Sequence, residues 1–138
     1  MADGITRLNP STLPDVGAVG YSQITVVDPG RMAYVSGQVA QSADGSPVPG
    51  DLDGQMRVVV RNARASLDAL GATPHDIAIV RCFVTDLTPE RLEVLMPHLQ
   101  DFFDGAQPSL TGVGVAALAE PKVRRRGPAD NMDPDIDL

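Results

Sequence analysis

Two stretches of the chain repeat apolar residues at helical spacing. In the first, which begins at Asp51, apolar residues recur every three or four positions while arginines and an aspartate occupy the opposite side. Gly71 follows where a left-handed residue is favoured, so we predict a helix of about five turns that ends there. The apolar positions of this stretch are Met56, Val59, Val60, Ala63, Leu67 and Leu70.

A second amphipathic helix is predicted to begin at Thr88. Thr88 is a favourable N-cap, Pro89 suits the first helical position, and Glu90 is favourable near the positive end of the helix dipole. Pro97 falls inside the stretch and removes an internal hydrogen bond, so we expect a kink there or a restart of the helix. The apolar positions are Leu92, Leu95, Met96, Leu99, Phe102 and Phe103.

Alternation and continuous apolar runs predict the strands. Residues 22–27 and 31–36 flank a turn sequence, Asp28-Pro29-Gly30, and therefore predict a β-hairpin. The nearly continuous apolar run of residues 77–87 predicts a central strand buried on both faces. Residues 107–118, rich in small side chains, predict a further strand.

The order of these elements predicts an α+β domain with both helices on one face of a mixed sheet. The other face of the sheet also needs cover, and a second subunit would supply it. We expect one domain over residues 1–126, followed by an acidic, mobile tail over residues 127–138. The apolar strand residues that favour a subunit contact are Ile24, Val26, Val35, Ile79, Val113 and Val115.

Composition narrows the possible environments and partners. The chain has 138 residues, a mean hydropathy of −0.03 and no apolar run long enough for a membrane span, and its N-terminus lacks the pattern of a signal peptide. We therefore expect a cytoplasmic protein with no membrane partner. A net charge of −7 argues against nucleic-acid binding. The single cysteine, Cys82, lies in an apolar run and is predicted to be a buried structural thiol.

A set of short motifs resembles a known protein family. In their order and spacing, from about Ile5 to Leu118, they resemble the RidA/YjgF family of reactive-intermediate deaminases. The resemblance implies a chorismate-mutase-like fold, assembled as a homotrimer whose sheets face a central barrel, with small-molecule clefts between subunits. It also implies hydrolysis of enamines and imines, such as 2-imino acids, without a cofactor or metal. The motifs are YSQ at 21–23, YVSGQV at 34–39, the alanine-rich pattern of 62–72, FVTDL at 83–87 and the pair Phe102-Phe103.

Three residues match positions that line the cleft in the family. The resemblance places Tyr21 at the cleft edge, and it places Ser36 and the backbone of Gly37 in the pocket. Both assignments have structural alternatives: Tyr21 can simply begin a strand, and Ser36 can satisfy a backbone group at a bulge.

One departure from the family falls at Leu110. This leucine aligns with an arginine that grips the substrate carboxylate in the family. Leucine cannot replace a bidentate, charge-assisted contact, and its loss costs about 2–5 kcal/mol of binding in a closed cleft. The resemblance therefore does not carry the usual 2-imino acid substrates to this chain.

The water-placing glutamate of the family is also replaced. It aligns with Arg125, or with Arg124 or Arg126 after a shift of one residue, and arginine cannot act as a base near neutral pH. We hypothesise that an arginine of this triplet enters the cleft and supplies the cation missing at Leu110. The alternative is that the triplet is a solvated surface patch.

Four other residues were weighed as site candidates. Met96 aligns with an asparagine of the second helix and Gly112 with a frequent cysteine. His75 and His98 have no recognisable partner in the sequence and are expected to be structural or exposed. Metal-ligand spacings, phosphate loops and nucleophile elbows are absent from the sequence.

The predicted function is that of a divergent family member. It binds a small molecule in an inter-subunit cleft and acts on an enamine, imine or ring-closing intermediate other than simple 2-imino acids. An apolar wall of Leu110, Val113 and Met96 favours this prediction. The alternatives are a weak deaminase of 2-iminobutanoate or 2-iminopropanoate, and a non-catalytic trimeric binding or regulatory protein. The ribonuclease activity described for some relatives fits poorly with the acidic charge.

Overall fold

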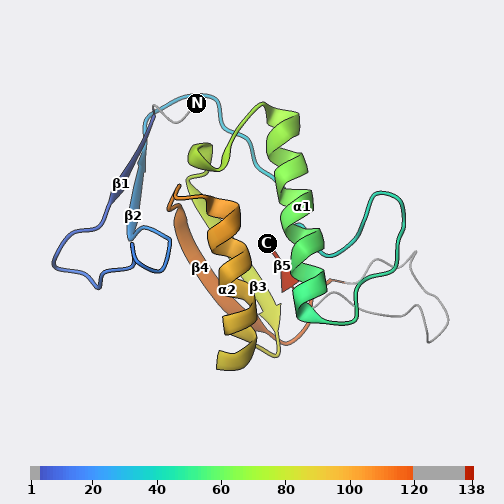
Figure 1. The fold of residues 1–138 in the computed structure, drawn as a ribbon. Helices are drawn as coiled ribbons and strands as arrows, with labels where there is room; N and C mark the ends of the chain where they lie inside the picture. The colour runs from blue at the N-terminus through green and yellow to red at the C-terminus, as the bar shows by residue number, and fades with distance from the viewer. Residues whose placement is uncertain (1–3, 120–135) are drawn as a thin grey trace.

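The computed structural model describes residues 4–119 and 136–138, and it has two layers. Two helices lie over one face of a three-stranded sheet with the strand order β4-β3-β5 (Figure 1). Because β3 runs parallel to β4 and antiparallel to β5, the sheet is mixed, and the predicted α+β class is confirmed. The elements of these layers are α1 (Leu52–Leu70), α2 (Pro89–Phe103), β3 (Ile79–Thr85), β4 (Ser109–Val115) and β5 (Ile136–Asp137).

Helix α1 begins and ends where the sequence predicts. The Asp51 side chain accepts a hydrogen bond of 3.2 Å from the backbone N–H of Gly54, and Gly71 ends the helix with a φ of 65°. The predicted apolar stripe is one residue too long, because Leu70 is 51% exposed in the last turn. The buried side chains of α1 are Leu52, Gln55, Met56, Val59, Val60 and Leu67.

Helix α2 also begins at its predicted cap. The Thr88 hydroxyl accepts a 3.2 Å hydrogen bond from the backbone N–H of Arg91. The helix continues through Pro97 as one element, so the restart weighed at this proline does not occur. Leu92, which the stripe predicted to be buried, is 44% exposed. The buried side chains are Leu95, Leu99, Phe102 and Phe103.

The two faces of the sheet differ in burial. Val80, Cys82 and Val84 of β3 are buried under the helices, as the alternation of a strand requires. Cys82 is thus the buried thiol that the sequence predicts. On the other face, Ile79 is 49% exposed and Val113 is 38% exposed, because no other described element covers them. The prediction that this strand is buried on both faces is therefore wrong for the single chain.

We call this second side of the sheet the open face. It is defined by alternate residues of β3 and by the residues of β4 that pair with them in parallel register. Phe83 also pairs with Asp137 of β5, which places Asp137 on the open face, whereas Ile136 pairs with Val84 on the helix side. The open-face residues of β3 and β4 are Ile79, Arg81, Phe83, Thr85, Ser109, Thr111, Val113 and Val115.

The predicted hairpin of residues 22–27 and 31–36 does not form. Strand β2 (Ile24–Val27) instead pairs antiparallel with β1 (Ile5–Leu8), in a register that joins Ile5 to Val27. Residues 31–36 lie exposed and form no strand, and Tyr34 is 86% exposed. The prediction was wrong because β1, a short segment far from the turn sequence, supplies the ladder partner of β2. A short 3-10 helix, η1 (Pro74–Asp76), precedes β3.

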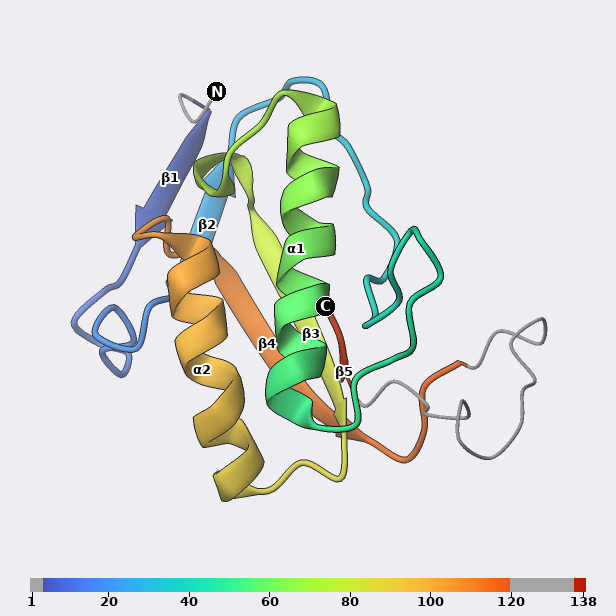
Figure 2. The same ribbon diagram turned by 45° about the vertical axis from the view of Figure 1, so that its right-hand side comes forward.

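The end of the chain belongs to the sheet. Ile136 is fully buried in the core, and β5 lies behind α1 in Figure 2. The predicted mobile tail is therefore wrong for residues 136–138, because their alternation of apolar and acidic side chains suits a strand on the free edge of β3. Residues 120–135, which include the boundary predicted at residue 126, fall outside the described part of the chain.

Candidate functional site

The predicted pocket element, Ser36 and Gly37, lies beside β5. The next residue, Gln38, exchanges two backbone hydrogen bonds of 2.9 Å with Leu138, and Val39 forms an antiparallel bridge with Asp137. These bonds attach residues 38–39 to the outer edge of β5. The sequence motif is therefore positioned by the end of the chain.

The Asp137 carboxylate lies directly over Gly37. A Cβ atom at position 37 would collide with both carboxylate oxygens of Asp137, so this position requires glycine for a reason of space. Gly37 and Asp137 thus form a close contact between the predicted pocket and the last strand. Sequence reasoning missed Asp137 because it treated the acidic end of the chain as solvated.

The electrostatics of Asp137 are unusual for a carboxylate. Its Oδ1 atom is buried and has no hydrogen-bond donor within the described part of the chain. Burial raises the pKa of Asp137 above its ordinary value of 3.8. Burial, together with the charge of Asp137, raises the pKa of the neighbouring Cys82 thiol to about 11. A buried carboxylate oxygen without a donor is costly, so its position in the fold calls for an explanation.

Leu110 lies on the helix side of the sheet. It pairs with Val80 in the parallel register, is half-buried and packs against the hydrophobic core. Gly112 follows two residues later on the same side, and a Cβ atom there would meet no described atom within 4 Å. Met96 of α2 is also half-buried against the core. All three expected site residues on this side are apolar or lack a side chain.

Tyr21 lies near the start of β4. The adjacent Ser22 donates a 2.6 Å hydrogen bond from its hydroxyl to the backbone oxygen of Gln107, and it forms a parallel bridge with Ser109. Tyr21 itself is half-buried. Tyr21 and Leu110 are the chain neighbours of the bridged pair Ser22 and Ser109, so the structure brings them near each other.

The expected site residues form two separate groups in one chain. Tyr21, Met96, Leu110 and Gly112 belong to the β4 side, whereas Ser36 and Gly37 belong to the β5 side. β3 lies between them, and the backbones of Leu110 and Asp137 are roughly 14 Å apart from the spacing of strands and residues. Leu110 and Asp137 also project from opposite faces. The single chain does not bring the two groups into one cleft.

Arg125 and its neighbours Arg124 and Arg126 lie outside the described residues. Their proposed entry into the cleft stays a prediction. The strand that follows β4 in the described chain is β5, and its carboxylate is Asp137.

His98 has a partner that the sequence did not reveal. Its Nε2 atom lies 2.7 Å from Oδ1 of Asp53 in the first turn of α1, and Arg57 donates to Oδ2 of Asp53 at 3.0 Å. The hydrogen bond with His98 and then that with Arg57 lower the pKa of Asp53. The expectation that His98 lacks a partner is wrong, whereas a structural role fits this link between the helices.

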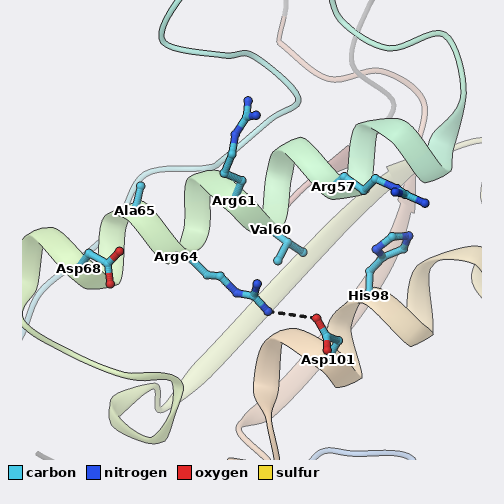
Figure 3. A pocket seen from close by; sticks show the side chains of 8 residues that line it. All are labelled: Arg57, Val60, Arg61, Arg64, Ala65, Asp68, His98 and Asp101. Atoms are coloured by element: carbon cyan, nitrogen blue, oxygen red, sulfur yellow. Dashed lines mark hydrogen bonds and ion pairs between the residues drawn. The ribbon is translucent and has the colours of Figure 1, made fainter.

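A groove of about 390 Å³ lies between the two helices (Figure 3). Two of its three arginines pair with acids, Arg64 with Asp101 at 3.1 Å and Arg57 with Asp53, and Arg61 donates to the Ser42 hydroxyl at 2.7 Å. Of the residues considered for a site, only His98 lines it, and its imidazole is already bonded to Asp53. We therefore assign the candidate site to the sheet. The groove is lined by Arg57, Val60, Arg61, Arg64, Ala65, Asp68, His98 and Asp101.

The fold places the chain among Rid-like α+β proteins. The solved structure of YyfB from Yersinia pestis, a Rid-family protein of unknown function, matches with a TM-score of 0.83 and 29% identity, covering 97% of this chain and 94% of that one. RidA from Psychrobacter matches with a TM-score of 0.63 and 25% identity, covering 85% and 82% of the two chains.

Sequence comparison gives the family itself. The family model described as Endoribonuclease L-PSP matches residues 14–124. YjgH of Escherichia coli K12, a RutC-family protein, is 37% identical over 65% of this chain and 68% of its own. TdcF of the same organism, provisionally named a reactive intermediate deaminase, is 31% identical over 74% of this chain and 79% of its own. The chain belongs to the RidA/YjgF family.

The described residues contain neither a membrane-spanning helix nor a cluster of metal-binding side chains. None of their helices combines the length and apolar character needed to cross a membrane. Nor do three or more of their histidine, cysteine and acidic side chains gather where they could hold a metal ion. Among the described residues, the candidate site offers the carboxylate of Asp137, the hydroxyls of Ser36 and Tyr21, and the nearby backbone.

Proposed function

We propose that this protein is a homotrimer that binds a small molecule in clefts between subunits, and that it acts on a reactive enamine or imine other than a simple 2-imino acid. The observation that carries the proposal is Leu110. The family position that holds a substrate-gripping arginine is here an apolar side chain packed against the core. A ligand carboxylate at this position would lose its charge-assisted partner.

Two features of the single chain support its assembly into an oligomer. Its open face exposes apolar side chains, including Ile79 and Val113, and the extended segment around Tyr34 exposes more. The two groups of site residues are separated by β3, so a cleft that uses both needs a second copy. Both observations favour a symmetric oligomer in which one copy supplies the Leu110 group and the next supplies Ser36 and Gly37.

The proposed reaction is hydrolysis of a carbon–nitrogen double bond. Water adds to the carbon, and one of its protons passes through a carboxylate to the nitrogen. The proton of the resulting hydroxyl then follows the same route to the nitrogen as the remaining carbon–nitrogen bond breaks, which gives a carbonyl compound and an amine or ammonia. Asp137 is the carboxylate available for this transfer, since it lies against Gly37 and has no competing donor among the described residues. Deaminase activity is also supported by the similarity to TdcF, whose name describes a reactive intermediate deaminase.

An oxidase-coupled assay tests the substrate assignment. An amino-acid oxidase generates 2-iminopropanoate, and its decay is followed with this protein, with a control deaminase and without either. We expect little acceleration by this protein, but clear acceleration with an enamine or imine that lacks the carboxylate. Acceleration of 2-iminopropanoate decay equal to that of the control would contradict the proposal and favour the simple deaminase.

Light scattering tests the assembly. We expect the mass of three chains in solution. A stable monomer would contradict the proposed cleft, whereas a trimer that accelerates no imine hydrolysis would favour the non-catalytic alternative.

A further inference from the structure

We propose that the cleft selects ligands whose reacting nitrogen is cationic and that carry no adjacent carboxylate, and that Asp137 is the residue that recognises this cation. The inference rests on the proposed function, because it assigns a ligand charge to the same cleft. Its ligand class is that of iminium ions and protonated amines.

The first observation is the position of the Asp137 carboxylate. It lies against the backbone of Gly37, where a side chain would collide with it, and residues 38–39 hold β5 in place through hydrogen bonds and a bridge. The side chain therefore points at the predicted pocket element from a fixed strand. Because the Asp137 side chain is only half-buried, its accessible part can contact a ligand.

The second observation is that Oδ1 of Asp137 has no hydrogen-bond donor among the described residues. Oδ1 of Asp137 is buried and accepts no hydrogen bond from any described residue. Two other aspartates differ from Asp137 in this respect. Asp53 is hydrogen-bonded to His98 and Arg57, and Asp101 accepts a hydrogen bond from Arg64. An ionised, partly desolvated carboxylate without a donor attracts a cation and repels an anion.

The third observation concerns the charges around the site. Leu110 supplies no cation for a ligand carboxylate. Arg81 shares the open face and lies two residues before Phe83, the register partner of Asp137, but it forms no ion pair with Asp137. Cys82 is the other titratable neighbour, and its thiol stays neutral near pH 7 because its pKa is about 11. Among the described residues, the charge next to Gly37 is therefore that of Asp137.

Two ring compounds of the same shape test the inference. The probes are 2-methyl-1-pyrroline, at a pH at which its nitrogen is protonated, and 1-pyrroline-2-carboxylate; cyclopentanone serves as a neutral control. Binding to the assembled protein is measured by calorimetry. We expect the protonated methyl compound to bind at least about tenfold more tightly than the carboxylate. Equal affinities, tighter binding of the carboxylate, or no binding of the methyl compound would overturn the inference.

A matched pair of variants assigns the effect to Asp137. Asp137→Asn removes the charge and keeps the shape, and we expect it to weaken binding of the cation by about tenfold while cyclopentanone binding is unchanged. Asp101→Asn makes the same change in the helix groove, on an 80% exposed side chain, and should leave binding unaltered. Unchanged cation binding in Asp137→Asn would overturn the inference.

The two proposals can fail separately. Cation binding that depends on Asp137, without any acceleration of imine hydrolysis, would contradict the proposed activity and support this inference. If Asp137→Asn accelerates hydrolysis of cationic and neutral substrates as much as the wild type does, the hydrolytic activity would be supported, whereas this inference and the proton-transfer role of Asp137 would both be overturned.

Discussion

The two faces of one sheet have opposite properties, although the same strands form both. On the helix side, Val80, Val84 and Ile136 are buried under α1 and α2. On the open face, Ile79 and Val113 remain exposed. Because side chains alternate along a strand, each strand contributes equally to both faces, and the difference comes from the helices alone. The helix face is completed within the chain and the open face is not.

Two aspartates differ in a similar way, in their hydrogen bonds and in the direction in which their pKa values are shifted. Asp53 lies between the helices, and its hydrogen bonds to His98 and Arg57 lower its pKa. Asp137 lies on the open face without a donor among the described residues, and burial raises its pKa. The comparison indicates that the satisfied group stabilises the fold, and it supports the proposal that the unsatisfied one binds a ligand.

The largest expected difference between the faces comes from two isoleucines. Ile136→Ala on the helix side should lower the free energy of unfolding by about 2–5 kcal/mol, because it removes a fully buried side chain from the core. Ile79→Ala, the same change at a half-exposed residue of the open face, should cost less than about 1 kcal/mol in the monomer. Urea denaturation at low protein concentration measures both.

Equal losses in the two variants would contradict the assignment of β5 to the core. If assembly covers the open face, Ile79→Ala should also shift the trimer toward monomer in light scattering. Ile136→Ala should do so only in proportion to its loss of stability.

A substitution at Gly37, which lies against Asp137 of the open face, should change the free energy of unfolding by less than Ile136→Ala does. Gly37→Ala places a methyl group against the Asp137 carboxylate and should cost about 1–3 kcal/mol. Gly30→Ala is the matched control, since its added atom would meet nothing within 4 Å. Asp137→Gly in the Gly37→Ala background should recover part of the loss, because it removes the other partner of the collision. Losses that simply add would show that the carboxylate does not occupy this space.

Local rules predicted the helices well. Asp51 and Thr88 cap α1 and α2, and Gly71 ends α1, because capping depends only on residues a few positions apart. Ladder partners are set by residues distant in sequence, so the hairpin of residues 22–27 and 31–36 was wrong. The stripe patterns also included Leu70 and Leu92, which lie at the margins of the apolar faces and are exposed.

The candidate site was predicted only in part. The resemblance identified Ser36 and Gly37, and it identified Leu110 as a departure, since those positions lie within matched motifs. It missed Asp137 because the alignment put the last strand at Arg125, whereas the described strand is at residues 136–137. The alternation Ile136-Asp137-Leu138 was the available signal. It was too short to distinguish a strand from an acidic tail.

The last prediction compares the two aspartates by pH. The raised pKa of Asp137 means that the folded state holds its proton above pH 3.8, where the unfolded chain has released it. Stability therefore falls as pH rises through this window, and Asp137→Asn should be more stable than the wild type at pH 7, with the gain disappearing toward pH 3.8 and below. Asp53 has a lowered pKa, so its stabilising effect is present above pH 3.8 and is lost as pH falls through its folded value.

Asp53→Asn should accordingly be less stable than the wild type at pH 7, and the difference should shrink in acid. Free energies of unfolding, measured in urea at steps from pH 7 to pH 3, give both curves. The opposite signs are the decisive feature, because a general effect of removing one negative charge from an acidic protein would stabilise both variants alike. If Asp137→Asn instead destabilises the fold at pH 7, its carboxylate has a donor, and the contrast between the two faces does not extend to their charges.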